Sequence, residues 1–99
     1  MVKQFDVYLC ESRSRQRPCL VLSPDEMNAH LPYVIVAPIT TIERIFPCRV
    51  GVRLKGKQGQ VAPDMMRTVL KSALKEKMGT LPEKTRLEIA DILRQMFSI

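Results

Sequence analysis

The first 70 or so residues contain segments with the alternating or clustered apolar pattern that is typical of β-strands. Five segments have this pattern, namely residues 5–11, 19–23, 33–40, 48–55 and 60–69. The first and fourth segments alternate apolar with polar residues, which predicts strands with one buried face. The second and third are apolar on both faces, which favours the centre of a sheet. Pro38 is expected to mark the end of the third strand, and Pro63 to bend the fifth.

The same pattern predicts which side chains point inward and where the chain turns. The expected inward residues are Phe5, Val7 and Leu9 in the first strand, and Cys48, Val50, Val52 and Leu54 in the fourth. The tetrapeptide GKQG, residues 56–59, predicts a hairpin turn between the fourth and fifth strands. Residues 24–28 predict a turn or a single helical turn.

The period changes to that of a helix at the end of the chain. Pro82 suits the first position of a helix, and Glu83 suits the positive end of the helix dipole. The apolar residues at helical spacing are Leu87, Ala90, Leu93 and Phe97, with Ile89, Ile92 and Met96 broadening the stripe. This face is expected to pack on the sheet. The sequence therefore predicts a mainly β single domain over residues 1–99, in which a strongly bent antiparallel sheet or barrel carries one C-terminal helix.

The charge of the chain narrows the class of partner. The net charge is +6 and the pI is about 9.6, which favours a polyanion such as nucleic acid, an acidic protein segment or a membrane surface. Three widely spaced cysteines and one histidine argue against a structural zinc site, and we expect no metal and no cofactor. Since no signal peptide or membrane span is recognisable, a cytoplasmic protein is expected.

Three arginines stand at every second position just before the second apolar segment. They are Arg13, Arg15 and Arg17. In an extended backbone their guanidinium groups would share one face. Two interpretations are open: an edge strand that uses charge to resist aggregation, or a site that binds an anion.

The remaining residues limit the chemistry that the chain can perform. There is no glycine-rich phosphate loop and no G-x-S-x-G or H-E-x-x-H motif, and the single histidine excludes a two-histidine acid–base pair within one subunit. Arginine and hydroxyl groups remain, and they suit phosphate chemistry. RNA cleavage by the substrate's own 2′-hydroxyl needs little more. Arg17 and Thr40 stand at the ends of expected neighbouring strands and could stabilise the phosphate in this reaction. The same sequence is equally compatible with Arg17 as a surface cation and Thr40 as a turn residue.

Three segments carry a resemblance to a known family. They read RPCLVLSPDEMN from Arg17, VIVAPITT from Val34, and GKQGQVAPDMMRTV from Gly56. Together they give an Arg-Pro pair before an apolar strand, a strand that ends in Pro-x-Thr, and a downstream Asp-x-x-Arg-Thr. In this order and spacing, the motifs resemble the MazF/PemK/Kid family of toxins of type II toxin–antitoxin systems, and the similarity spans nearly the whole chain.

The resemblance implies a compact SH3-like antiparallel barrel and a homodimer. It implies a metal-independent, sequence-specific endoribonuclease that cuts single-stranded RNA, usually mRNA, leaves a 2′,3′-cyclic phosphate and a 5′-hydroxyl, and so arrests growth. It also implies an antitoxin partner whose acidic, partly disordered tail covers the site, which the positive charge fits. The catalytic residues that it implies are Arg17, Thr40 and Asp64, and the residues expected to contact RNA are Arg13, Arg15, Gln16 and Met65.

Two features depart from the family pattern. The segment CESRSRQ, residues 10–16, is several residues shorter than usual, and Arg13 and Arg15 are expected in this loop, where they contact the RNA backbone, contact the antitoxin's tail, or are simply solvated. Met65 stands where a base-reading glutamine is usual, and Leu70 where an acid is usual. The short loop and the chain ends also resemble the related CcdB toxins, which poison DNA gyrase, although this chain has no tryptophan. A gyrase poison and a non-catalytic binding module are therefore kept as alternatives.

Overall fold

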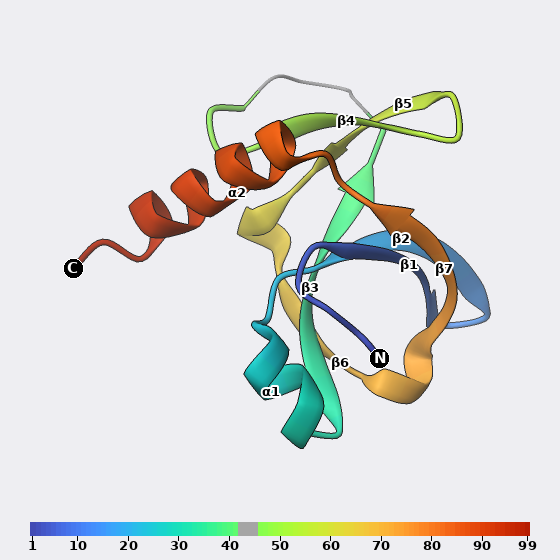
Figure 1. The fold of residues 1–99 in the computed structure, drawn as a ribbon. Coiled ribbons are helices and arrows are strands. Elements are labelled where there is room, and N and C mark those ends of the chain that lie inside the picture. Colours follow the sequence, from blue (N-terminus) through green and yellow to red (C-terminus); the bar gives the residue numbers. More distant parts are fainter. Residues whose placement is uncertain (42–45) are drawn as a thin grey trace.

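A curled antiparallel sheet with a C-terminal helix forms the fold (Figure 1). The computed structural model describes residues 1–41 and 46–99. Its strands are β1 (Asp6–Ser12), β2 (Arg15–Val21), β3 (Tyr33–Thr40), β4 (Val50–Leu54), β5 (Lys57–Val61), β6 (Arg67–Leu70) and β7 (Leu74–Thr80). Its helices are α1 (Asp25–His30) and α2 (Glu83–Met96), with short 3₁₀ turns at Pro63–Met65 and Lys71–Ala73. The mainly β architecture that the sequence predicts is confirmed.

Strand β3 is the centre of the sheet. The strand order is β4-β5-β3-β2-β1-β7, and β6 also pairs with β3. The N-terminal half of β3 pairs with β6, and its last two residues, Ile39 and Thr40, pair with β5. This change of partner lets the sheet bend and brings the end of β3 to the β4–β5 hairpin.

Both faces of the central strands are buried, which explains why their sequences are apolar on both faces. One cluster contains Val7, Leu20, Leu22, Ala37, Ile39, Val50, Val52, Val61, Leu81 and Ile89. The other contains Cys10, Cys19, Val21, Val34 and Val36. Since the members alternate along β2 and β3, the two clusters lie on opposite faces of these strands. The expected inward positions Val7, Val50 and Val52 are buried.

Two tight hairpins differ from the expected turns. Arg13 and Ser14 have φ of 48° and 68°, so they form the two-residue turn between β1 and β2. The prediction that Arg15 lies in a loop is therefore wrong, because β2 begins at that residue. Lys55 and Gly56, with φ of 47° and 80°, form the second turn, which is earlier than the predicted turn over residues 56–59.

Residues 60–69 form two strands where one bent strand was expected. Strand β5 ends at Val61, the 3₁₀ turn Pro63–Met65 follows, and β6 begins at Arg67. The predicted bend at Pro63 is thus a complete break in the strand. The sequence also predicted no element for the segment that forms β7, which pairs with β1 through a register with two irregularities.

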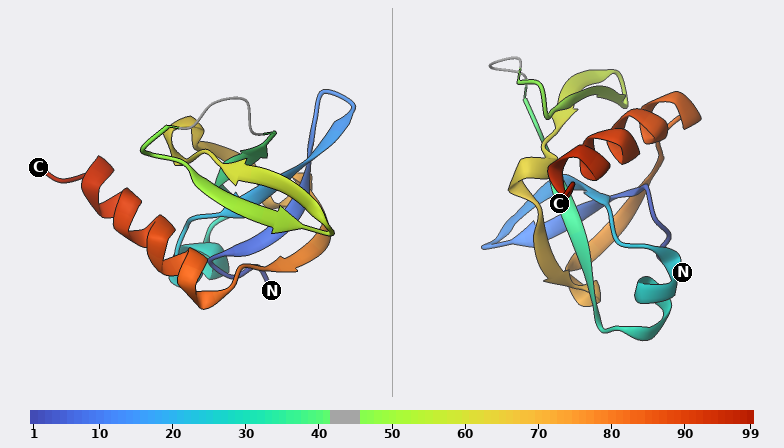
Figure 2. Two further views of the ribbon diagram at one scale, coloured as in Figure 1. Left: turned by 90° about the horizontal axis from the view of Figure 1, so that it is seen from above. Right: turned by 90° about the vertical axis from the view of Figure 1, so that its left-hand side faces the viewer.

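The C-terminal helix packs on the sheet through fewer residues than its apolar stripe suggests. Ile89 is fully buried, and Ile92 and Leu93 are half-buried against the same cluster. Leu87 and Phe97 are each 61% exposed, so the prediction that they pack on the sheet is wrong. Leu87 lies two residues before the buried Ile89, so it is on nearly the opposite side of the helix. Phe97 follows the last residue of α2, whose C-terminal part extends beyond the sheet (Figure 2).

Gly59 permits the close approach of β5 to β3. A Cβ at this position would lie 3.1 Å from the carbonyl oxygen of Thr40 and 3.2 Å from Cγ2 of Ile39. Because the first of these atoms is backbone, the strands must separate to accept it. We expect Gly59→Ala to lower the free energy of unfolding by about 1–3 kcal/mol, measured by urea denaturation.

Gly51→Ala is the matched control for this substitution. Its Cβ would lie 3.6 Å from Nε2 of Gln58, which is an ordinary contact. If the two alanine variants unfold at the same urea concentration, the close approach at Gly59 does not limit stability.

Candidate functional site

A pocket of about 800 Å³ opens where β2 begins and β3 ends. The β4–β5 hairpin forms its opposite wall, and Met78 of β7 also contributes. The polar and charged residues that line it are Arg17, Thr40, Thr41, Arg49, Lys55, Lys57, Gln58 and Gln60. The lining has four cationic side chains and no carboxylate among the described residues, so the pocket suits an anionic ligand.

The pocket brings Arg17 and Thr40 together. Strands β2 and β3 are antiparallel with Cys19 opposite Pro38, and this register extended by two residues places Arg17 opposite Thr40. Opposite residues in an antiparallel pair have their side chains on the same face. The expectation that these two residues stand at neighbouring strand ends is confirmed, while their chemical roles stay a prediction. Arg17 is exposed and Thr40 is half-buried.

Thr40 carries an unsatisfied hydroxyl. Its Oγ1 is buried and has no hydrogen-bond partner within residues 1–41 and 46–99. A buried hydroxyl without a partner costs about 1–3 kcal/mol, so such groups are uncommon and often mark functional sites. A rotation of the side chain that turns this hydroxyl into the pocket would let it donate to an acceptor that a ligand brings.

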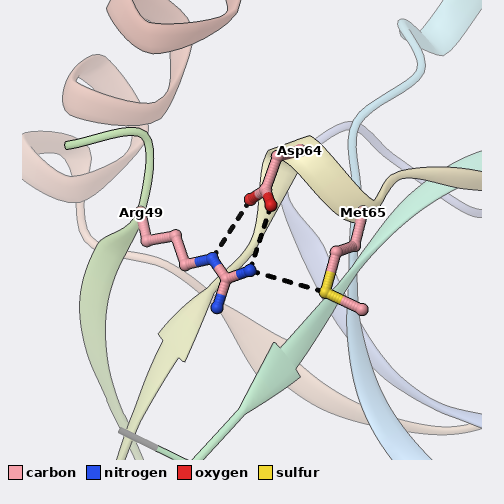
Figure 3. A network of polar contacts seen from close by, with 3 residues as sticks. All are labelled: Arg49, Asp64 and Met65. Carbon is pink, nitrogen blue, oxygen red and sulfur yellow. Dashed lines mark hydrogen bonds and ion pairs between the residues drawn. The ribbon is translucent and has the colours of Figure 1, made fainter. Parts of the chain in front are cut away.

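Asp64 is held by a bidentate ion pair with Arg49 (Figure 3). Nε of Arg49 donates to Oδ1 of Asp64 at 3.1 Å, and a terminal guanidinium nitrogen donates to Oδ2 at 3.0 Å. This ion pair lowers the pKa of Asp64 below its ordinary value of 3.8. Asp64 is therefore an acceptor and not a proton donor at neutral pH. It lies beside the pocket, outside the lining.

Arg49 is a site residue that the sequence alone did not reveal. It lines the pocket, lies over the ring of Phe46 at 4.7 Å from the centroid, and donates to the sulfur of Met65 at 3.6 Å. Arg49 stands between the expected inward residues Cys48 and Val50, so the strand pattern gives it only an outward position. The sequence does contain the opposite charges of Arg49 and Asp64. Because the two residues are 15 positions apart, the sequence gave no reason to expect an ion pair between them.

The four predicted RNA contacts are not part of the pocket's lining. Arg13 is exposed at the tip of the β1–β2 hairpin, and Arg15 and Gln16 are exposed on β2. Arg15 shares a face with Arg17, whereas Gln16 points to the opposite face. Met65 is 51% exposed beside Asp64 and contacts Arg49.

Other reactive groups in the described residues do not form a second centre. They include no cluster of three or more His, Cys, Asp or Glu side chains that could hold a metal ion. Burial raises the pKa of the Cys19 thiol to about 12, so it stays protonated and is a poor nucleophile. Within the described part of the chain, neither helix has the length and apolar content that crossing a bilayer requires.

The lowered pKa of Asp64 predicts a pH-dependent part of stability. A depressed folded-state pKa gives stability that is complete above the unfolded-state value and is lost as the pH falls through the folded-state value. The unfolded-state pKa of an aspartate is roughly 4, so the free energy of unfolding of wild type, measured in urea, should fall as the pH drops below 4. Asp64→Asn lacks this contribution at every pH, so its free energy of unfolding should fall less over the same range. Asp91→Asn on α2 controls for the loss of one carboxylate. Parallel pH profiles for wild type and Asp64→Asn would contradict the prediction.

Comparison with known proteins agrees with the fold. Residues 3–97 match the family described as PemK-like, MazF-like toxin of type II toxin-antitoxin system. The chain is 31% identical to endoribonuclease MazF of Staphylococcus epidermidis, over 94% of this chain and 88% of that protein.

Two solved structures have the same fold. An endoribonuclease from a mycobacterial species, solved with its cognate antitoxin, has a TM-score of 0.89 at 24% identity and covers 100% of this chain and 97% of its own. The Mycobacterium tuberculosis toxin MazF-mt6 has a TM-score of 0.83 at 25% identity, over 95% of this chain and 97% of its own.

The matched span and the identity to the staphylococcal relative define the class of protein. The chain belongs to the PemK-like, MazF-like family of toxins of type II toxin–antitoxin systems. The resemblance inferred from the three sequence motifs is thereby confirmed, and the SH3-like barrel that it implied agrees with the matched structures.

Proposed function

We propose that this chain is the toxin of a type II toxin–antitoxin module and acts as an endoribonuclease on single-stranded RNA. The observation that carries the proposal is the unsatisfied hydroxyl of Thr40 opposite Arg17, in a pocket lined by cations. Family membership supports the same activity. The reaction needs no metal, because the nucleophile belongs to the substrate.

The reaction begins with attack of a ribose 2′-oxygen on the adjacent phosphorus. The bond from phosphorus to the 5′-oxygen of the next nucleotide breaks, which leaves a 2′,3′-cyclic phosphate and a 5′-hydroxyl. Solvent takes the 2′-proton and supplies the proton of the leaving oxygen. The protein therefore has to align the reacting atoms and stabilise the negative charge that builds up on the phosphate.

Arg17 and Thr40 supply this stabilisation. The Arg17 guanidinium binds two phosphate oxygens at once and keeps its charge throughout the reaction. The Thr40 hydroxyl, once turned into the pocket, donates to a non-bridging oxygen of the phosphate. This contact gives the hydroxyl the hydrogen bond that it lacks in the free protein. The hydrogen bond strengthens as negative charge develops on the phosphate oxygen, so it stabilises the transition state more than the bound substrate. Asp64, held ionised by Arg49, accepts hydrogen bonds from RNA and does not transfer a proton.

The residues around the pocket extend the RNA site. Arg13 and Arg15, both on the β1–β2 hairpin, bind phosphates of the nucleotides on either side of the cut. Gln16 and Met65 contact neighbouring nucleotides. The same cationic surface binds an antitoxin with an acidic C-terminal segment, and the toxin acts as a homodimer in the cytoplasm. Competition between RNA and antitoxin for one surface explains how the module is silenced.

Cleavage of a mixed-sequence single-stranded RNA in excess EDTA tests the proposal. We expect discrete fragments that carry 5′-hydroxyl and cyclic phosphate ends. Folded protein that leaves RNA intact, with or without added divalent metal, would contradict the proposal. Inhibition of DNA gyrase by the same preparation would favour the CcdB-like alternative, and RNA binding without cleavage would favour the non-catalytic binder.

A further inference from the structure

We propose that Gln60 is a further residue of the cleavage site, whose side-chain amide binds the 2′-hydroxyl of the nucleotide that is cut. The inference rests on the proposed function and deepens it, because it assigns the residue that orients the nucleophile. Sequence analysis placed Gln60 only within a returning strand.

Gln60 lies beside Thr40. The register of β3 and β5 pairs Thr40 directly with Gln60, and β4 pairs Gly51 with Gln60 on its other side. Directly paired residues of antiparallel strands project from the same face with their Cβ atoms about 4.5–5.5 Å apart. The amide of Gln60 and the hydroxyl of Thr40 therefore belong to one part of the pocket, which both residues line.

The burial of Gln60 is unusual for a glutamine. The residue is only 5% exposed, yet none of the side-chain hydrogen bonds found among the described residues involves it. An apolar side chain would fill this position without the cost of removing an amide from water. An amide that lines the pocket and has no hydrogen bond with the described residues is available to a ligand.

The chemistry of an amide fits a 2′-hydroxyl. Oε1 of Gln60 accepts the hydroxyl's hydrogen bond, which fixes the direction of the lone pair that attacks phosphorus. Nε2 remains free to donate to a phosphate oxygen beside Thr40. An amide cannot take the proton, so proton removal stays with solvent, and Gln60 acts by orientation. The contact also distinguishes RNA from DNA at the cut.

The first test is single-turnover cleavage by Gln60→Met, which keeps the length of the side chain and removes both hydrogen-bonding groups. We expect the cleavage rate to fall by about 10–100-fold, as for other losses of alignment. Thermal unfolding should show that the variant folds, because the substitution removes a buried amide. If Gln60→Met does not fold, Gln60→Leu is used in its place.

The second test is specific for the 2′-hydroxyl. In a Thr40→Val background, which is expected to cut RNA too slowly to disturb a binding measurement, a single 2′-deoxy substitution at the cleavage site should weaken binding by about 5-fold, the worth of one hydrogen bond. The same substitution should change nothing when Gln60→Met is added, whereas an equal loss of binding in both proteins would overturn the inference.

The outcomes separate this inference from the proposed function. If wild type cuts no RNA, the proposed function fails whatever Gln60 does. If wild type cuts RNA and Gln60→Met cuts at the same rate, only the role of Gln60 is overturned. A slower Gln60→Met that selects a different cleavage sequence would assign Gln60 to a base and also overturn the contact with the 2′-hydroxyl.

Discussion

Thr40→Val should slow RNA cleavage by about 10²–10³-fold and leave the protein at least as stable as wild type. Valine has nearly the shape of threonine and suits a strand, so the core around β3 does not change. The substitution removes a buried hydroxyl that has no partner among the described residues, which should raise the free energy of unfolding by up to about 1 kcal/mol. It also removes a donor to the phosphate, and loss of one such donor slows comparable reactions by about 10²–10³-fold.

Single-turnover cleavage and urea unfolding measured on the same preparation test this prediction. Thr80→Val, at the exposed end of β7 and outside the pocket, is the matched control. A loss of activity that comes with a loss of stability would indicate that Thr40 has a structural role. Unchanged cleavage would remove Thr40 from the site.

Arg17→Ala should reduce cleavage by about 10³-fold or more, since it removes the cation that lies opposite Thr40. Because the side chain is exposed, the free energy of unfolding should change by less than about 0.5 kcal/mol. Arg17→Lys keeps the charge but cannot bind two oxygens in one plane, so its rate should fall between those of wild type and Arg17→Ala. Rates measured against RNA concentration separate binding from the chemical step.

Arg86→Ala on α2 removes the same charge at a distance from the pocket. If it slows cleavage as much as Arg17→Ala, the effect belongs to net charge and not to the position of Arg17. If Arg17→Lys is as active as wild type, a point charge is sufficient and the bidentate contact is unnecessary.

The positions of Arg17 and Thr40 could be predicted because each follows from local sequence. Arg17 precedes a run of buried residues, and Thr40 ends another, so antiparallel neighbours bring the two ends together. The position of Arg49 could not be predicted in this way. Its ion pair with Asp64 depends on the packing of β4 beside the 3₁₀ turn Pro63–Met65, which is a contact between distant parts of the chain.

Strand β7 was missed because its sequence has almost no strand pattern. LKEKMGT has three charged residues in succession and no apolar alternation, and it becomes a strand because the edge of β1 supplies hydrogen-bond partners. The expected stripe on α2 was wrong for the opposite reason. The apolar residues are spread around more of the helix than the sheet covers. Leu87 lies on nearly the opposite side from the buried Ile89, and Phe97 lies beyond the end of α2.

The β1–β2 hairpin changed the interpretation of the three arginines. Its two-residue turn extends both strands, so Arg15 and Arg17 lie on one face of β2, while Arg13 lies at the turn. The period of two predicted the shared face of Arg15 and Arg17 correctly. The turn could not be assigned from Arg13 and Ser14, since neither residue is typical of a position with positive φ.

The ends of RNA fragments test the central claim most directly. RNA is collected after brief induction of the protein, and its 5′-hydroxyl ends are mapped in cells that express wild type, Thr40→Val or Arg17→Ala at equal levels. New 5′-hydroxyl ends at one recurring sequence, produced by wild type alone, are the predicted result. Growth arrest without new 5′-hydroxyl ends, or the same ends with all three proteins, would contradict a ribonuclease built on Arg17 and Thr40.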